Sequence, residues 1–236
     1  MSLYFRQWLS GEDFAVGDPI ASQMVNFVYA IGDTETREAV LVDPAYATAD
    51  LLDLLAADDM HLTGILATHW HPDHVGGEFA GHKIEGVAAL LERDEVKAKV
   101  HVQAPEAEML KAWTGIGDSD IVTHSSGDVL EVGRAKITLI HTPGHTPGSQ
   151  CFCVEDCLVS GDTLFLEGCG RTDLPGGDAD QLYESLTQRL ASIPDNTILY
   201  PGHRYAPKAS ASMGETRESN FVYRIPNLEA WRQFMG

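Results

Sequence analysis

The stretch "THWHPDHVGG", residues 68–77, places three histidines and an aspartate within six consecutive positions. These residues are His69, His71, Asp73 and His74. The whole chain has only ten histidines. Burying three neutral imidazoles beside a carboxylate would contribute little to the stability of a fold, because each polar group must find a partner. Imidazole and carboxylate are, however, the groups that bind zinc and related ions. The stretch therefore predicts a metal site.

The length and composition indicate a globular protein. A chain of 236 residues with 44% hydrophobic content can bury one large core or two small ones, and we expect a single domain over residues 1–236. No run of about 18 apolar residues is present, so no membrane-spanning helix is expected. The first residues, "MSLYFRQWLSGEDF", lack the apolar block of a signal peptide. We therefore expect a cytoplasmic protein.

The net negative charge indicates which classes of binding partner to expect. The formal charge is −19, from 35 acidic and 16 basic residues. Such a surface repels nucleic acid and anionic membranes, so we expect neither as a partner. The expected partner is a small-molecule substrate, and the sequence leaves the oligomeric state open.

Three of the four cysteines lie close enough to suggest a metal or disulfide cluster, but the pattern around them favours a role in the core. Three of them lie in "SQCFCVEDCLVSGD", residues 149–162, which alternates as two strands joined by a turn at Glu155–Asp156. Cys151 and Cys153 would then share one face of the sheet as small hydrophobic residues. Buried free thiols are typical of a reducing compartment.

Short apolar runs alternate with helical patterns along the chain, which indicates an α+β fold. We expect strands within residues 25–32, 39–45, 62–70, 99–105, 135–145, 149–154, 157–165 and 196–205. We expect helices over residues 49–60, 85–100, 106–113, 178–193 and 227–236. The helix over 178–193 would be capped by Asp178 or Asp180 and would end before Pro194.

Polar residues follow the apolar strands at four places. His69, His145, Asp162 and His203 each come at the C-terminal end of such a strand. Because strand ends are rigid and converge on one edge of a sheet, we expect these distant residues to meet in one site. The other five histidines, for which we expect structural roles, are His61, His82, His101, His124 and His141.

Two ion sites can be assembled from these residues. The first set is His69, His71 and His145. The second set is Asp73, His74 and His203. Asp162 can bridge the two ions through its two carboxylate oxygens, and a water or hydroxide would lie between them.

This order of motifs resembles the metallo-β-lactamase superfamily, whose signature is His-x-His-x-Asp-His followed by a distant His, Asp and His. The resemblance covers roughly residues 24–208. The matching residues are His69, His71, Asp73, His74, His145, Asp162 and His203. The resemblance implies a four-layer αβ/βα sandwich, in which two mixed sheets pack face to face with helices outside and the metals lie at one edge.

Two divalent ions, zinc first and iron as the alternative, define the expected chemistry. They would lower the pKa of a shared water, so that a metal-bridging hydroxide attacks a carbonyl carbon and an ion stabilises the oxyanion. Asp73 would orient the hydroxide and take its proton. This chemistry suits thioesters, esters, lactones and β-lactams.

The run "GCGRTDLPGGD", residues 168–178, narrows the resemblance to the branch of glyoxalase II (hydroxyacylglutathione hydrolase) and the persulfide dioxygenases. By this resemblance Arg171 would receive a substrate carboxylate, for instance of a glutathione-like group. Tyr205 matches a tyrosine that helps to hold glutathione. Alternatively, Arg171 is a surface ion-pair partner and Tyr205 a packing residue. Where glyoxalase II carries an aromatic pair, this chain has "TDLPGG".

We therefore expect a binuclear hydrolase that cleaves a thioester or related ester. One alternative is a persulfide dioxygenase, which would use a single iron held by two histidines and one aspartate. Another is a lactonase or β-lactamase. The non-enzymatic alternative is a zinc-stabilised binding module, which would have closed coordination and no exchangeable water.

Overall fold

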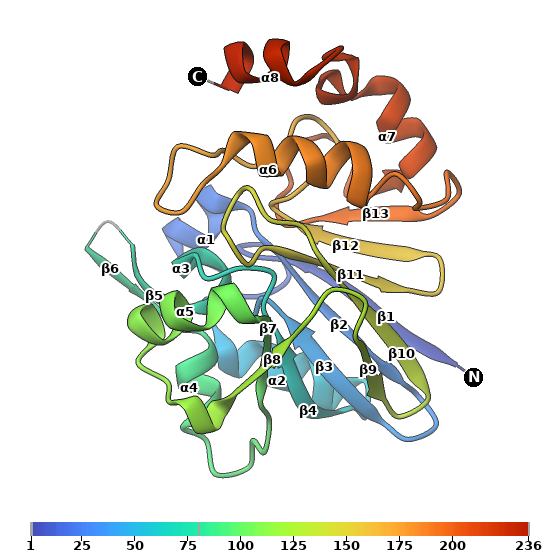
Figure 1. Ribbon diagram of the computed structural model, residues 1–236. Helices are drawn as coiled ribbons and strands as arrows, with labels where there is room; N and C mark the ends of the chain where they lie inside the picture. The colour runs from blue at the N-terminus through green and yellow to red at the C-terminus, as the bar shows by residue number, and fades with distance from the viewer. Residues whose placement is uncertain (1, 80, 236) are drawn as a thin grey trace.

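The computed structural model describes residues 2–79 and 81–235. Two six-stranded sheets pack face to face, and helices cover the outer side of each (Figure 1). The layers run helix, sheet, sheet, helix. The predicted α+β class and the four-layer αβ/βα sandwich are confirmed.

The first sheet has the order β1-β2-β3-β4-β7-β8. Its strands are β1 (Leu3–Leu9), β2 (Phe27–Asp33), β3 (Glu38–Val42), β4 (His61–Leu66), β7 (Val100–Gln103) and β8 (Ile121–His124). Strand β2 pairs antiparallel with both β1 and β3, and the strands predicted within residues 25–32 and 39–45 are thus neighbours. From β3 onward the pairs are parallel.

The second sheet has the order β14-β13-β12-β11-β10-β9. Its strands are β9 (Val129–Val132), β10 (Ala135–His141), β11 (Gln150–Val154), β12 (Cys157–Gly161), β13 (Ile198–Pro201) and β14 (Ala211–Ser212). All its pairs are antiparallel except β12 with β13. Each sheet thus contains parallel strands whose C-terminal ends reach one edge.

The helices fall into two outer layers, as Figure 1 shows. On the first sheet lie α2 (Thr48–Ala57), α4 (Val87–Leu91) and α5 (Ala107–Thr114). Over the second sheet lie α6 (Ala179–Glu184), α7 (Met213–Ser219) and α8 (Leu228–Met235). Near the edge that carries the site are α1 (Pro19–Met24), α3 (Pro72–Val75) and the small hairpin of β5 (Gly77–Phe79) and β6 (His82–Ile84). Among the described residues, no helix has the length and apolar character needed to cross a membrane.

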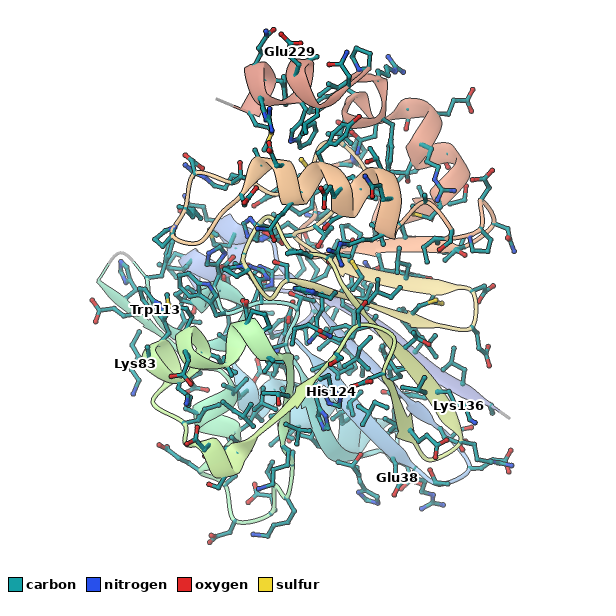
Figure 2. All side chains as sticks on the ribbon, viewed as in Figure 1. Glu38, Lys83, Trp113, His124, Lys136 and Glu229 are labelled. Atoms are coloured by element: carbon teal, nitrogen blue, oxygen red, sulfur yellow. The ribbon has the colours of Figure 1, made fainter. Side chains whose placement is uncertain are left out.

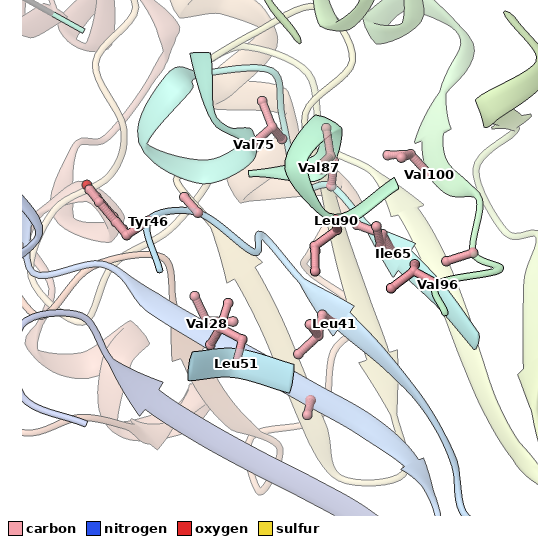
Figure 3. Close-up of a cluster of buried hydrophobic side chains, with 14 of the residues drawn as sticks. Val28, Leu41, Tyr46, Leu51, Ile65, Val75, Val87, Leu90, Val96 and Val100 are labelled. Atoms are coloured by element: carbon pink, nitrogen blue, oxygen red, sulfur yellow. The ribbon is translucent and has the colours of Figure 1, made fainter. Parts of the chain in front are cut away.

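Strand β2 is covered on both faces, by the helices on one side and by the second sheet on the other. All seven of its residues are buried. Val28 and Ala30 belong to the core beneath the helices, whereas Tyr29 and Ile31 belong to the core between the sheets. Figure 3 shows Val28 among the side chains of the helix-side core, close to Leu51 of α2. A strand covered on both faces favours a continuous apolar run over an alternating one.

The cysteine-containing hairpin forms as predicted. Strands β11 and β12 pair antiparallel across the turn at Glu155–Asp156. Cys151 and Cys153 both face the core beneath α6, while Phe152 faces the core between the sheets. All four cysteines are free thiols.

The helix expected over residues 85–100 is much shorter than predicted. Helix α4 covers only Val87–Leu91. Beyond it Val96 and Ala98 are buried, whereas Lys97 and Lys99 are exposed. That alternation has the period of two of extended chain, and it leads directly into β7.

The other predicted helices form with shifted ends. Asp178, rather than Asp180, caps α6, because its side chain accepts a hydrogen bond from the Gln181 backbone N–H. A turn of π-helix, Ser185–Arg189, continues α6 and ends before Pro194. In the helix predicted over 227–236, Gly236 lies outside the described residues.

Candidate metal centre

The predicted ligands gather at the edge where the parallel strands end. His69 follows β4, Asp162 follows β12 and His203 follows β13. The sheets are joined there by backbone hydrogen bonds from Phe27 N to Gly202 O (2.8 Å) and from Gln150 N to Thr68 O (2.9 Å). Strand ends of both sheets therefore supply one site.

Four of the predicted ligands lie off the strand ends. His145 is not at the end of β10, which stops at His141; it lies in the following turn. Asp73 and His74 lie on the one-turn helix α3, and His71 is its N-cap residue. Pro72 at the first position of α3 favours a helix start there, since its fixed φ suits the helix and no N–H is lost.

The first group that can hold an ion consists of His69, His71 and His145, which are all buried. Each offers a ligand atom, and these atoms lie within 4.8 Å of one another. The Nε2 atom of His145 is 3.0 Å from Nδ1 of His71. This group coincides with the first predicted ligand set.

The second group consists of Asp73, His74 and His203, which are also buried. The Nε2 atoms of His74 and His203 lie 3.2 Å apart. The Oδ2 atom of Asp73 lies 3.5 Å from the first of these nitrogens and 3.4 Å from the second. This group coincides with the second predicted set.

Asp162 lies between the two groups. Its Oδ1 atom is 3.5 Å from Nε2 of His74. Its Oδ2 atom is 3.7 Å from Nε2 of His145 and 3.4 Å from Nε2 of His203. Gly202 permits this position, because a Cβ there would lie 2.4 Å from the Asp162 carboxylate. The carboxylate can therefore reach both groups at once.

Backbone carbonyls fix the orientation of two of the histidines. Nδ1 of His145 is 2.7 Å from the Arg171 carbonyl oxygen, to which it donates. Nδ1 of His203 donates in the same way to the Met24 carbonyl oxygen, at 2.8 Å. A histidine whose Nδ1 carries the proton presents an unprotonated Nε2, which is the form that binds a metal.

Asp43 and Thr68 orient two further histidines. Nδ1 of His74 lies 2.9 Å from Oδ2 of Asp43. The Thr68 hydroxyl donates to Asp43 at 2.6 Å and lies 2.9 Å from Nδ1 of His69, from which it accepts. Asp43, His69 and His74 also satisfy the spacing of a metal group. Because the Asp43 carboxylate already accepts these hydrogen bonds, we assign it an orienting role.

The residues present fit bound ions. Among the described residues, six buried side-chain nitrogen or oxygen atoms have no hydrogen-bond partner. Two of these are ligand candidates, namely Nε2 of His69 and Oδ1 of Asp162. A third, Nε2 of His71, belongs to a ring whose Nδ1 is the atom beside His145. An unpaired buried polar atom costs free energy, so an atom in this state indicates a partner that completes the site.

The protonation states also suit metal binding. Burial lowers the pKa of the His69 and His145 imidazoles, and it lowers the pKa of His71 to about 3. These rings are therefore neutral near pH 7. Burial opposes ionisation of Asp73 and Asp162, but the neighbouring histidines outweigh it and lower both carboxyl pKa values. Burial opposes protonation of His74 and His203, but the Asp73 and Asp162 carboxylates outweigh it, raising the pKa of His74 to about 10 and also that of His203. The first group thus offers neutral imidazoles, whereas an ion at the second group would displace protons from its rings.

A buried glutamate that the sequence did not reveal connects the two ligand loops. Glu106 accepts hydrogen bonds from the backbone N–H of Trp70 (2.7 Å) and of Gly148 (2.7 Å). It also accepts one from the Thr146 hydroxyl at 2.8 Å. Burial raises its carboxyl pKa to about 7. Glu106 lies in "APEAEML", which reads as an ordinary helix start, and its distance from the histidine motifs in the sequence did not indicate a role at the site.

Asn26 and Asp43 were missed as well. The Asn26 amide donates to Oδ2 of Asp73 at 3.1 Å and accepts from the Tyr46 hydroxyl at 2.9 Å. A sequence signal existed for Asp43, since in "AVLVDPA" an acid follows an apolar strand, the same pattern that identified Asp162. Asn26, directly before β2, had no comparable signal.

A cavity of about 810 Å³ opens onto the centre and carries both predicted substrate-binding residues on its wall. The Arg171 guanidinium makes two hydrogen bonds of 2.6 Å to Asp173. Tyr205 stacks on the His203 ring, with centroids 4.7 Å apart and planes at 5°. Arg171 thus forms an ion pair and Tyr205 a packing contact, which are the alternative roles considered for them.

The remaining histidines lie outside the metal-capable groups of the described residues. His101 and His124 pair with each other, with Nδ1 of the first 2.8 Å from Nε2 of the second. Nε2 of His141 donates to the Pro147 carbonyl oxygen at 2.8 Å. His61 and His82 are exposed.

The sequence is similar to a known protein family. The model of the metallo-beta-lactamase superfamily matches residues 23–203. The chain belongs to the metallo-β-lactamase superfamily. This confirms the resemblance inferred from the histidine and aspartate motifs.

Relatives in this superfamily include both enzyme types expected from the sequence. The hydroxyacylglutathione hydrolase of Pseudomonas savastanoi pv. phaseolicola is 34% identical over 88% of this chain and 73% of the relative. The human mitochondrial persulfide dioxygenase ETHE1 is 30% identical over 82% of this chain and 70% of the relative. The crystal structure of ETHE1 from Myxococcus xanthus superposes with a TM-score of 0.78 at 31% identity, over 98% of this chain and 89% of that one.

Proposed function

We propose that this protein is a binuclear metallohydrolase that cleaves a thioester or related ester of a small molecule. The position of Asp162 carries the proposal, because its carboxylate lies within 3.4–3.7 Å of histidines from both groups. Seven side chains then serve two ions. The ligands we propose are His69, His71, Asp73, His74, His145, Asp162 and His203.

Residues around the proposed ions would have separate roles in catalysis and in substrate binding. When bound, two divalent ions would supply a hydroxide nucleophile at neutral pH and polarise the scissile carbonyl group. Asp73, held in place by the Asn26 amide, would orient the attacking water and take its proton. The cavity beside the centre would hold the substrate. Cys169 on its wall is a poor alternative nucleophile, since burial raises its thiol pKa to about 12.

Zinc is the metal we propose. A site of imidazoles and carboxylates without thiolate suits zinc, and it also suits iron.

The second candidate function, a persulfide dioxygenase, is favoured by the similarity to human persulfide dioxygenase ETHE1. It would need one iron held by two histidines and one carboxylate. A lactonase or β-lactamase would use the same centre, whereas the cavity that opens onto it disfavours a closed binding module.

One pair of measurements tests the proposal. Metal analysis of protein grown without supplements should give about two zinc ions per chain, where a dioxygenase would give about one iron. Hydrolysis of thioesters should be compared with O₂ uptake in the presence of glutathione persulfide. Thioester cleavage without O₂ uptake supports the hydrolase. O₂ uptake with one iron would replace it by the dioxygenase.

Two wider expectations remain proposals. We propose that residues 1–236 form one domain, which is supported by the core that β2, β3, β10 and β11 share between the sheets. We also propose a cytoplasmic location, which the four free thiols support.

A further inference from the structure

Exposed aromatic side chains gather around the cavity beside the centre. Among the described residues, seven large hydrophobic side chains are exposed. Four of them line this one cavity, namely Phe79, Tyr205, Phe221 and Phe234. Single exposed hydrophobic residues are normal on a protein surface. A group of them around one concavity beside a reactive centre indicates a site for an apolar group.

The C-terminal helix is fixed in a way that leaves Phe234 over the cavity. Trp231 of α8 is fully buried, and its indole N–H donates to the Ala179 carbonyl oxygen at 2.7 Å. Arg232 forms an ion pair with Asp180. These contacts hold α8 on α6, and Figure 2 shows Glu229 pointing outward at the far side of the helix. Phe234 is left 54% exposed.

The aromatic wall consists of two sets of contacting rings. The centroids of Phe221 and Phe234 lie 5.3 Å apart. Phe165 contacts Tyr205 with centroids 5.1 Å apart, and Tyr205 stacks on the ligand candidate His203. Both sets line the same cavity, and the second set reaches the metal centre at His203.

The charges on the cavity wall oppose an anionic substrate. Apart from the proposed ligands, the charged residues on the described wall are Glu167, Arg171 and Asp173. The single cation, Arg171, is already paired with Asp173. Lys83 lies on the same hairpin as Phe79 but lines a separate cavity beside Trp113 (Figure 2). Glutathione carries two carboxylates, and this wall offers no free cation for either.

We propose that this cavity selects substrates by a neutral, apolar group lying against Phe221 and Phe234, and that it disfavours glutathione conjugates. The inference rests on the proposed hydrolase function, whose substrate class it names. The occupant is an apolar acyl chain of a thioester or ester, and the wall orients it so that the carbonyl reaches the metal centre.

Binding is tested first, without catalysis. Calorimetric titration of the metal-loaded protein would compare two non-hydrolysable thioethers, S-octyl-N-acetylcysteamine and S-octylglutathione. We expect the neutral compound to bind at least about fivefold more tightly. Phe234→Ala and Phe221→Ala should each weaken its binding by about five- to tenfold. Val129→Ala, an exposed apolar residue outside the cavity, is the matched control and should leave binding unchanged.

Measurements of kcat/KM then test whether the aromatic wall also selects among substrates. For N-acetylcysteamine thioesters from acetyl to octanoyl, kcat/KM should rise by about threefold per methylene group, and the Phe234→Ala variant should flatten this rise. Light scattering of each variant serves as a second readout. If Phe234→Ala dissociates an oligomer, the aromatic wall is a subunit interface and the inference is overturned.

The remaining outcomes separate the two proposals. Equal or tighter binding of S-octylglutathione overturns the inference, as does an Arg171→Ala variant that loses affinity for that compound alone. Selective binding of the neutral thioether without cleavage of any thioester supports the cavity assignment but contradicts the hydrolase. Cleavage of glutathione thioesters with no dependence on chain length leaves the hydrolase standing and overturns the inference.

Discussion

The Asp43 carboxylate and the His74 imidazole form a buried pair, in which Oδ2 lies 2.9 Å from Nδ1. The pair holds the proton on Nδ1 and points Nε2 toward His203. Asp43 thus acts on the proposed metal site through the ring that it orients.

Replacing Asp43 should therefore weaken metal binding without removing a ligand. We expect Asp43→Asn to lower metal affinity by about 10- to 100-fold. Competition with a chromophoric chelator would measure it. The control is Asp53→Asn, an exposed acid on α2, which should bind metal as the wild type does. Unchanged affinity in Asp43→Asn would show that the orienting role is wrong.

Glu106 should matter for both stability and metal binding. Its removal leaves the backbone N–H groups of Trp70 and Gly148 unpaired in the interior. We expect Glu106→Ala to lower the free energy of unfolding by about 3 kcal/mol, measured in urea on metal-free protein.

Two further variants separate a specific role of Glu106 from a general effect of charge. Glu106→Gln retains an acceptor and should lose less stability than Glu106→Ala. Glu108→Gln, on the exposed side of α5, should behave as the wild type. If Glu106→Ala unfolds at the wild-type urea concentration and binds metal normally, the two ligand loops do not depend on Glu106.

The cysteine thiols should be unreactive in the folded protein. Burial raises the thiol pKa of Cys151 to about 11 and that of Cys169 to about 12. Since the thiolate is the reactive form, neither should be alkylated by iodoacetamide at pH 8 within the time that labels the unfolded chain fully. Peptide mass spectrometry before and after denaturation would show this. Rapid native labelling of Cys169 would reopen its role as a nucleophile.

Much of the proposed site followed from the sequence because its signal is local and repeated. His69, His71, Asp73 and His74 are close in the chain, and Asp162 and His203 directly follow strands whose apolar runs are easily recognised. Parallel strands bring such ends to one edge, so the meeting of distant residues was predictable.

What escaped the sequence depends on three-dimensional contacts. Glu106 and Asn26 are single polar residues in ordinary surroundings, and only the packed structure gives them partners. The end of α4 was misplaced because "ERDEVKAK" contains good helix formers, yet burial of Val96 and Ala98 favours extended chain there. Tertiary packing outweighed local propensity.

Acid should destabilise the protein partly through the His101–His124 pair. Burial lowers the His101 pKa from 6.5 to about 4, and His124 adds to the effect. The unfolded chain therefore binds more protons between pH 6.5 and 4, so stability is lost as the pH falls through this window. In metal-free protein, urea unfolding of His101→Gln should depend less steeply on pH there than unfolding of the wild type. Parallel curves would contradict the assigned cause.

The central claim is that seven side chains, gathered at the edge where both sheets end, hold two ions. Anomalous diffraction from crystals of the zinc-loaded protein tests it most directly. We predict two peaks about 3.5–4 Å apart, one beside His69, His71 and His145 and the other beside Asp73, His74 and His203, with Asp162 touching both. A single peak bound by two histidines and one aspartate, with the remaining predicted ligands turned away, would contradict the account.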